Sequence, residues 1–312
     1  MEIISGLHNL RPRHKGCVLT IGNFDGVHRG HQRLIDHLQL QSKSLQLPTM
    51  LMTFEPQPRE FFAGAMLPAR LTRFREKVHL LERTGLDRLL CLPFNEQTSQ
   101  IPAEWFAEEF LTELVGARYV VIGDDFRFGH ERQGDFQLLQ NTGARLGYEV
   151  ISVDTVLQGG DRVSSTLVRS TLSAGNFSKA AELLGHEYFI MGRVVYGRQL
   201  GRQLGVPTAN LKLQRYRAAL EGVYCVTVDG VAEDGQPLQG IANIGVRPTV
   251  DGKEPLLEVH VFDFSGDLYG RRLRVTFKHK LRDEQAFASL ELLKQQIDSD
   301  LRNARRWFAK SI

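Results

Sequence analysis

The sequence predicts an α/β domain built on a parallel sheet, followed by an antiparallel β-barrel that ends in a helix. The first half alternates short apolar runs with longer amphipathic runs, which is typical of a parallel sheet covered by helices on both faces. The second half has short alternating runs separated by Asp-Gly turns, which is typical of antiparallel strands. The chain has 312 residues, enough for two domains of ordinary size.

The first half supplies the elements of the parallel sheet. Strands are expected at 18–21, 50–54, 88–92, 119–122 and 149–153. Helices are expected at about 31–45, 73–84, 102–115 and 135–146. Ligands of such sheets bind beyond the carboxyl ends of the strands, so the two glycine-bearing motifs that follow the first and fourth strands are candidate binding segments.

The second half supplies the barrel. Strands are expected at 188–195, 222–229, 239–243, 256–262 and 272–278. Turn signals lie at 229–230, 234–235, 251–252 and 265–267. A terminal helix is expected from 286 to 306, because Phe287, Leu290, Leu293, Ile297 and Leu301 recur at helical spacing. The domains are therefore expected to span residues 1–185 and 186–312.

Composition limits the classes of function. Hydrophobic residues make up 42% of the chain, and its formal net charge is +3. This mildly basic balance suits anionic substrates such as nucleotides but is weaker than that of a dedicated nucleic-acid binder. The cysteines Cys17, Cys91 and Cys225 are too few and too widely spaced for a disulfide framework or a zinc knuckle. No run is long and apolar enough for a signal peptide or membrane span, so we expect a cytoplasmic protein without membrane or nucleic-acid partners.

A glycine-rich turn with two histidines follows the first expected strand, in LTIGNFDGVHRGHQRLI. Glycines Gly22, Gly26 and Gly30 allow a sharp turn and let a phosphate approach the backbone. The helix that follows offers unpaired N–H groups to an anion, and His28 and His31 can donate to phosphate oxygens. A zinc site would need further ligands, and incidental surface histidines remain an alternative. The chain has neither GxxxxGK[ST] nor GxGxxG.

The segment GNFDGVHRGH resembles the GxFDGxHxGH signature of HxGH-type nucleotidyltransferases, which have a Rossmann-like fold. More narrowly, it resembles the N-terminal module of prokaryotic bifunctional riboflavin kinase/FAD synthetases. Four further segments agree in order: TFEPQPREFF (53–62), ARLTRFREK (69–77), VIGDDFRFG (121–129) and VSSTLVRSTL (163–172). The resemblance implies an FMN adenylyltransferase domain in the first half.

The same resemblance implies roles for individual residues. His28 and His31 would contact ATP phosphates during adenylyl transfer, and Arg169 would join them as a catalytic residue. The implied ATP-binding set is Gly22, Phe24, Asp25, Gly26, His28, His31, Asp125, Ser164, Ser165, Thr166 and Arg169. Taken alone, SSTLVR would only open a helix with a serine N-cap.

Asp125 is the least specific member of this set, because family members can carry asparagine there. A carboxylate only accepts hydrogen bonds unless it is protonated, whereas an amide also donates. Asp125 could contact the adenosine, contact a water on magnesium, or cap its own loop.

A second glycine-rich segment, GRVVYGRQLGRQLGVPTANL, spans residues 192–211. Alone it could be a basic loop between strands. Thr208 and Asn210 point the same way if PTAN is extended, and their oxygens are hard ligands that suit Mg²⁺ with bound phosphate. The segment resembles the GxVxxGxxxGRxLGxPTAN signature of riboflavin kinase. GVY (222–224), NIGVRPT (243–249), LEVHVFDFSGDLYG (257–270) and LRDEQAFASLELLKQQIDSD (281–300) match in order.

This second resemblance implies an antiparallel barrel that binds ATP and Mg²⁺ through Thr208 and Asn210, with Gly192 and Gly197 in the nucleotide site and Arg271 at the flavin. It also makes Glu258 the general base that activates the ribityl 5′-hydroxyl of riboflavin.

The strand that carries Glu258 can also be interpreted without the resemblance. Leu257, Val259 and Val261 alternate with Glu258 and His260, so the polar pair could line a solvated outer face. His260 is expected to support this face without a part in the chemistry.

The sequence therefore predicts a bifunctional enzyme that uses Mg-ATP twice, converting riboflavin to FMN and FMN to FAD with release of pyrophosphate. A protein with one decayed domain is an alternative, although both motif sets are intact. A flavin-sensing module that touches RNA is another, but Arg193, Arg198 and Arg202 have few aromatic neighbours beyond Tyr196. The sequence leaves the oligomeric state open.

Overall fold

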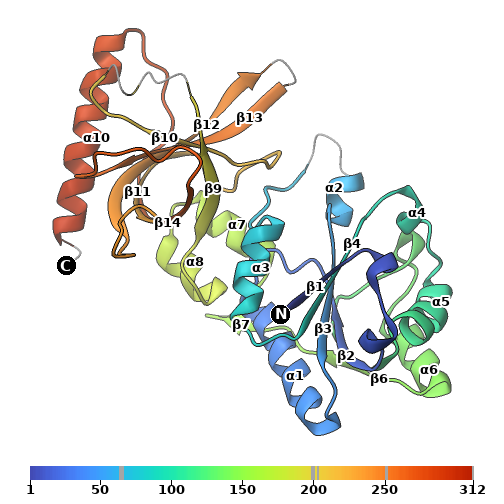
Figure 1. Cartoon of the computed structure of the whole chain (residues 1–312). Helices are drawn as coiled ribbons and strands as arrows, with labels where there is room; N and C mark the ends of the chain where they lie inside the picture. Colours follow the sequence, from blue (N-terminus) through green and yellow to red (C-terminus); the bar gives the residue numbers. More distant parts are fainter. Residues whose placement is uncertain (63–66, 198–200, 202–203, 250–251, 311–312) are drawn as a thin grey trace. The chain divides into compact units, whose positions relative to one another are not determined.

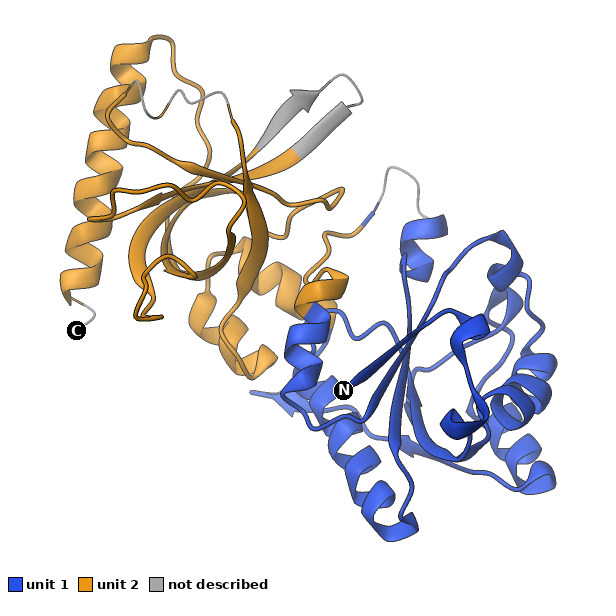
Figure 2. Ribbon diagram, in the orientation of Figure 1, with its two compact units in different colours: residues 1–67, 77–164 blue, residues 68–76, 165–312 orange. Residues whose placement is uncertain are grey.

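The computed structural model describes residues 1–62, 67–197, 201, 204–249 and 252–310. The chain forms two compact units (Figure 2): unit 1 contains residues 1–67 and 77–164, and unit 2 contains residues 68–76 and 165–312. Helices α7 (Ser165–Ser173) and α8 (Phe177–Leu184) thus group with unit 2. The domain boundary after residue 185 stays a prediction.

Unit 1 is built on a parallel six-stranded sheet with the order β1-β4-β3-β2-β5-β6 (Figure 1). Its strands are β1 (Glu2–Ser5), β2 (Cys17–Ile21), β3 (Thr49–Phe54), β4 (Arg88–Leu92), β5 (Ala117–Gly123) and β6 (Glu149–Val153). Every neighbouring pair is parallel, so the predicted α/β class is confirmed. Strand β1 is absent from the predictions because four residues at an edge carry too little alternation to mark a strand.

Helices connect these strands. They are α1 (Arg29–Leu45), α2 (Pro58–Phe62), α3 (Phe74–Glu82), α4 (Glu96–Ser99), α5 (Ala103–Trp105) and α6 (Phe136–Leu146). Helix α5 continues as a π-helical stretch, η4 (Phe106–Leu114). Short 3₁₀ turns are η1 (Leu7–Asn9), η2 (Pro12–His14) and η5 (His130–Arg132), and β7 (Leu157–Gln158) pairs with β8 (Asp161–Arg162) as a hairpin.

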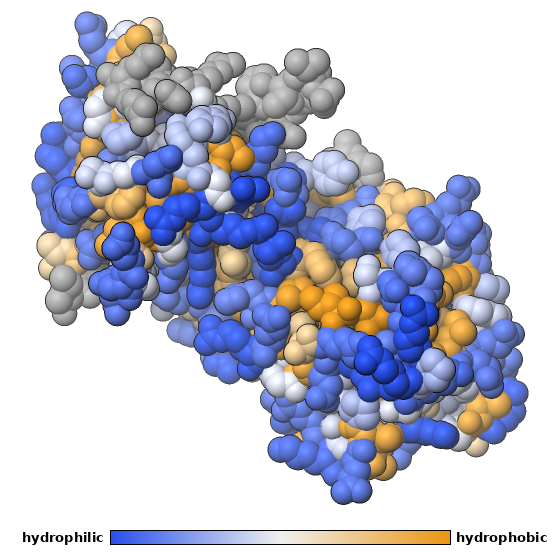
Figure 3. Space-filling view, viewed as in Figure 1, coloured by the Kyte–Doolittle hydropathy of each residue, from blue (hydrophilic) through white to orange (hydrophobic). Residues whose placement is uncertain are grey.

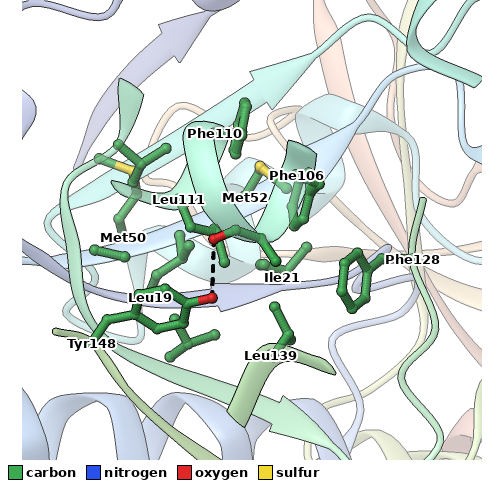
Figure 4. Packing of buried hydrophobic residues seen from close by; sticks show 14 of the residues in the cluster. Leu19, Ile21, Met50, Met52, Phe106, Phe110, Leu111, Phe128, Leu139 and Tyr148 are labelled. Carbon is green, nitrogen blue, oxygen red and sulfur yellow. Dashed lines mark hydrogen bonds between the residues drawn. The ribbon is translucent and has the colours of Figure 1, made fainter. Parts of the chain in front are cut away.

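One core cluster of unit 1 lies between the sheet and the η4 stretch (Figure 4). Leu19 on β2 and Met50 on β3 are fully buried, as is Leu111 on η4. The Tyr148 hydroxyl donates to the Ala107 carbonyl at 3.0 Å, which ties the start of β6 to the same stretch. Such packing fixes the position of β2, and therefore the position of the turn that begins at its carboxyl end.

Unit 2 is a closed antiparallel barrel with the order β10-β13-β12-β11-β14-β9, which confirms the predicted barrel. Its strands are β9 (Phe189–Val195), β10 (Ala209–Lys212), β11 (Gly222–Asp229), β12 (Leu238–Thr249), β13 (Gly252–Val261) and β14 (Arg272–Arg282). Strand β10 is absent from the predictions because it is short and begins inside PTAN, which has a loop-like sequence. Strands β12 and β13 extend farther toward their connection than expected, and Asp251 of the expected turn lies outside the described residues.

The terminal helix α10 (Leu290–Lys310) begins four residues later than the sequence predicts. The Ser289 hydroxyl accepts from the Leu292 backbone N–H at 3.3 Å, which marks the helix start. Ala304 and Phe308 of α10 pack on the barrel residues Val223 and Phe262. No described helix is long and apolar enough to cross a membrane, and the face drawn in Figure 3 is largely hydrophilic with scattered hydrophobic patches.

A buried ion pair joins segment 68–76 to the barrel inside unit 2. Arg215 donates from one terminal nitrogen to both carboxylate oxygens of Glu76 at 2.9 Å, and both side chains are 1% exposed. The carboxylate also accepts from the backbone N–H groups of Arg73 at 2.7 Å and Met191 at 2.8 Å. The Tyr188 hydroxyl donates to the Leu71 carbonyl at 3.2 Å. The segment is thus part of the folded barrel unit.

Replacing Arg215 with Met is expected to lower the free energy of unfolding of unit 2 by about 3 kcal/mol, because it leaves the Glu76 carboxylate buried without its cation. Denaturant unfolding, monitored by the intrinsic fluorescence of unit 2, measures this change in the free energy of unfolding. Arg217→Met, at an exposed position two residues away, is the matched control. The Glu76→Gln, Arg215→Met double variant should recover more than half of the loss, and a double variant no more stable than Arg215→Met would contradict this account.

Candidate functional site

Residues 22–30 form a tight glycine turn at the carboxyl end of β2. The Gly22 N–H donates to the Met52 carbonyl of β3 at 3.0 Å, so the turn leaves directly from the sheet. Phe24, Gly26 and Val27 have φ values of 47°, 84° and 44°, all in the left-handed region. Phe24 and Val27 are not glycines, and a backbone held in this region at a non-glycine residue is typical of functional sites.

The two histidines meet where this turn enters α1. His28 is the N-cap residue, and its Nδ1 accepts from the His31 backbone N–H at 3.4 Å. The two imidazole rings stack with centroids 3.7 Å apart, and Phe24 stacks on His31 at 4.6 Å. Asp25 is also buried in this turn, at 3% exposure. The histidines therefore stand side by side at a helix N-terminus, which attracts anions.

His31 is half-buried and keeps an unused polar atom on its inner side. Its Nδ1 is inaccessible to solvent and has no hydrogen-bond partner among the residues that the structure describes. Burial lowers the pKa of His31 well below its usual range, and the nearby charges of His28 and Lys77 lower it further. A neutral imidazole has one N–H donor and one acceptor nitrogen, so His31 can donate to an anion without carrying a charge itself.

The VSSTLVR segment begins beside this turn and continues into unit 2. A Cβ placed on Gly30 would lie 3.6 Å from the Val163 carbonyl and 3.2 Å from the His28 ring. The backbone at Val163 therefore lies close to the start of α1. Ser164 belongs to unit 1, whereas Ser165, Thr166 and Arg169 begin α7 in unit 2.

Within unit 2, Arg169 donates from its Nε to the Ala69 carbonyl. The predicted contacts of these α7 residues with ATP stay predictions.

Asp125 lies on the loop after β5, with its side chain 73% exposed. Arg162 of β8 pairs with Asp125 at 2.8 Å and with Asp124 at 3.3 Å, and the Thr155 hydroxyl donates to Asp124 at 2.7 Å. The two carboxylates thus hold the loop to the β7–β8 hairpin. This arrangement matches the loop-capping alternative for Asp125, while contact with ATP stays a prediction.

An aromatic cluster at the carboxyl edge of the same sheet is absent from the predicted site. Phe54 ends β3, Phe61 and Phe62 end α2, and Phe94 follows β4. The rings of Phe54, Phe61 and Phe62 each lie 5.6 Å from that of Phe94. Phe61 is 42% exposed and Phe62 67% exposed. The adjacent phenylalanines of TFEPQPREFF were the available signal, but sequence does not show that they meet Phe94.

The barrel brings three polar side chains into one row. Asn210 of β10 lies directly opposite Glu258 of β13, and Glu258 lies opposite Asn243 of β12. Directly opposed residues point to the same face of a sheet, while the flanking Leu257 and Val259 are buried on the other face. The row thus places a carboxylate between two amides.

The PTAN segment is held against this row. His260 of β13 has its Nδ1 2.8 Å from the Pro207 carbonyl, so an Nδ1–H donates there and fixes the start of PTAN. The Asn210 Oδ1 is buried and has no hydrogen-bond partner within the described part of the chain. The supporting role expected for His260 stays a prediction.

The glycine-rich loop passes close to PTAN. A Cβ on Gly197 would lie 2.6 Å from the Asn210 Cγ, and one on Gly201 would lie 3.2 Å from the Thr208 Oγ1. Gly192, on β9, is paired with Leu273 of β14. Residues 198–200 and 202–203, which include Arg198 and Arg202, lie outside the described residues.

Arg271 lies directly before β14 and is exposed, and its carbonyl accepts from the Val194 N–H at 2.9 Å. Among the residues that the structure describes, no three His, Cys, Asp or Glu side chains gather as a metal site.

Comparison with known families defines the class of protein. A family model for FAD synthetase matches residues 10–167, and one for riboflavin kinase matches residues 184–308. Both enzyme domains are therefore present, in the predicted order, and the chain is a two-domain transferase of flavin cofactor synthesis.

Full-length relatives identify the family. A bifunctional riboflavin kinase/FMN adenylyltransferase from Pseudomonas fluorescens is 51% identical over 100% of this chain and 99% of its own length. One from Escherichia coli K12 is 48% identical over 99% and 98%. The chain belongs to the bifunctional riboflavin kinase/FMN adenylyltransferase family, as predicted.

Among solved structures, the chain is similar to the "Macrolide-efflux Protein from Streptococcus pneumoniae". The TM-score is 0.79 at 31% identity, covering 98% of this chain and 100% of that one.

Proposed function

We propose that residues 186–312 phosphorylate riboflavin to FMN and that residues 1–185 adenylylate FMN to FAD. One observation carries this assignment: the two central pairs of candidate residues lie in different units, the stacked His28 and His31 in unit 1 and the Asn210–Glu258 pair in unit 2. Each unit thus carries its own set of groups suited to phosphate chemistry. ATP, riboflavin and FMN fit the activities that the family names state.

In the proposed kinase reaction, Glu258 is the general base. Its carboxylate accepts the proton of the ribityl 5′-hydroxyl as that oxygen bonds to the γ-phosphorus of ATP, and ADP leaves with the electrons of the broken P–O bond. Asn243 and Asn210 flank Glu258 in register, so their amides are in position to orient the carboxylate or the substrate. Arg271 is proposed to bind the flavin from its exposed position before β14.

We further propose that the kinase site binds Mg²⁺ together with ATP. Asn210 offers a buried Oδ1 that no described residue hydrogen-bonds, and Thr208 offers a hydroxyl beside the glycine loop. Both are hard oxygen donors, which fit Mg²⁺ with ATP phosphates as its other ligands. When bound, magnesium neutralises charge on the phosphates; Gly192 and Gly197 leave room for the nucleotide next to these side chains.

In the proposed adenylyl transfer, the FMN phosphate is the nucleophile. One of its oxygens bonds to the α-phosphorus of ATP, and pyrophosphate leaves, so no protein nucleophile is needed. His28, His31 and the α1 N-terminus stabilise the negative charge that builds on the phosphates. Gly22 and Gly26 shape the turn around them. Asp25, Asp125, Ser164, Ser165, Thr166 and Arg169 are proposed to complete the ATP site.

The aromatic cluster is our proposed platform for the flavin ring of FMN. The isoalloxazine is a flat aromatic system, and Phe61 and Phe62 expose aromatic surface at the sheet edge where ligands of parallel sheets bind.

Gly197→Ala is expected to lower kcat/KM for ATP in riboflavin phosphorylation about tenfold, because its Cβ displaces the Asn210 amide and a small misplacement lowers rates strongly. Steady-state kinetics at varied ATP measures this. FMN adenylylation by the same chain is the internal control. An unchanged kcat/KM for ATP would show that Asn210 is not part of the nucleotide site.

The proposal is tested by incubating the purified chain with riboflavin, ATP and Mg²⁺ and following the flavins by chromatography. FMN should appear first and FAD after it; EDTA should stop both conversions and excess Mg²⁺ should restore them. Formation of neither product would refute the proposed function, and full activity in EDTA would refute the metal. The cytoplasmic location stays a prediction from the sequence.

A further inference from the structure

Lys77 is a fully buried lysine that the proposed chemistry leaves without a role. It lies on α3, belongs to unit 1 and has an exposed fraction of 0%. Lysine is almost never fully buried unless it is paired, because burying a charge is costly. An apolar side chain would fill the same space at lower cost, so the position favours a role for the ammonium group.

The ammonium reaches the glycine turn through a short hydrogen-bond chain. Lys77 Nζ donates to the Thr53 hydroxyl at 3.2 Å, and this hydroxyl lies 3.4 Å from the Asn23 carbonyl, to which it donates. Thr53 is on β3 and is also 0% exposed. Asn23 lies between Gly22 and Phe24, inside the turn. These two hydrogen bonds therefore link a buried cation to the backbone that precedes the stacked histidines.

The charge of Lys77 also acts on the site electrostatically. Lys77 is one of the charges that lower the pKa of His31, so its field is felt at that ring. In a buried environment such a field is screened much less than in water. A cation here attracts the triphosphate of ATP, whose charge exceeds that of a nucleoside monophosphate.

We propose that Lys77 is a further positioning residue of adenylyl transfer: it holds the glycine turn through Thr53 and Asn23 and adds fixed positive charge for the ATP phosphates. This inference rests on the proposed adenylyl transfer at the His28–His31 turn. It assigns Lys77 no bond making or breaking. The proposal has two parts, the anchoring of the turn and the positive charge, and different substitutions can test them separately.

Three variants separate the two parts. Lys77→Met removes the charge at similar length, Lys77→Arg keeps it, and Thr53→Val keeps the cation but removes the hydroxyl that relays it to Asn23. Lys43→Met, which removes an exposed cation from the last turn of α1, is the matched control. The readouts are kcat and KM for ATP in FMN adenylylation, the Kd values of ATP and AMP, and riboflavin kinase activity.

Lys77→Met is expected to lower kcat/KM for ATP in adenylylation about 100-fold, in the range seen for loss of one stabilising donor. It should weaken ATP binding at least fivefold more than AMP binding, with kinase activity within twofold. Lys77→Arg should keep the ATP/AMP binding ratio of the unaltered chain. Thr53→Val should lower kcat for adenylylation while keeping this ratio, and Lys43→Met should change neither quantity.

Two results would overturn the inference. One is adenylylation by Lys77→Met within threefold of the unaltered chain; the other is equal weakening of ATP and AMP, which indicates a purely structural residue. If Lys77→Met also loses kinase activity through misfolding, Lys77→Arg decides, because a changed ATP/AMP ratio with the charge retained refutes the charge role. If the unaltered chain makes no FAD, the proposed function itself is refuted. If the unaltered chain makes FAD and the Lys77→Met variant makes it equally well, only this inference is refuted.

Discussion

Replacing Glu258 with Gln is expected to lower riboflavin phosphorylation about 10³-fold, because glutamine keeps the shape of the side chain but cannot accept the hydroxyl proton. Conversion of added FMN to FAD should not change, since the histidine turn lies in the other unit. Chromatography of the flavins formed from riboflavin, and separately from FMN, measures the two rates on one preparation.

The control for this variant is Glu233→Gln, which neutralises an exposed carboxylate of the same unit. Kinase activity in Glu258→Gln near that of the unaltered chain would show that Glu258 is not the base. Loss of both activities would point to misfolding, and near-ultraviolet circular dichroism would separate that outcome from a chemical one.

The reciprocal variant, His28→Ala with His31→Ala, is expected to lower FAD formation from FMN by about 10³-fold or more, because it removes two side chains that stabilise phosphate charge. Riboflavin phosphorylation should persist, so FMN should accumulate. Initial rates with saturating ATP measure the effect. The two losses are not expected to add, since stacked groups that act on one charge work as a unit.

His37→Ala, on the same helix, is the control for loss of an imidazole. His28→Asn keeps a capping side chain at the start of α1 and so separates the loss of the imidazole from fraying of the helix. FAD formation that is unchanged in the double variant would refute the assignment of both histidines.

The fold class was predictable from sequence because both halves have strong periodic patterns. The strands β2, β3, β4 and β5 are mostly apolar, which is typical of buried parallel strands, and Asp-Gly pairs separate barrel strands. The missed strands β1 and β10 are four residues each, too short for a pattern to emerge. The Glu76–Arg215 pair was also out of reach, because its partners are 139 residues apart.

The candidate sites were predictable mainly through resemblance. Patterns alone allowed an anion site at His28 and His31 and a solvated face at Glu258. The register that sets Asn210 beside Glu258 depends on barrel closure, which no local pattern specifies. The cluster around Phe94 and the link from Lys77 to Asn23 likewise depend on long-range contacts, since Thr53 is 24 residues from Lys77.

The most direct test of the central claim, that one chain performs two different ATP reactions at two sites, is the nucleotide stoichiometry. Starting from riboflavin, the account predicts one ADP for each riboflavin consumed and one pyrophosphate for each FAD formed. Starting from FMN, it predicts pyrophosphate alone, in a one-to-one ratio with FAD. Formation of ADP in step with FAD from FMN, or of FAD without pyrophosphate, would contradict it.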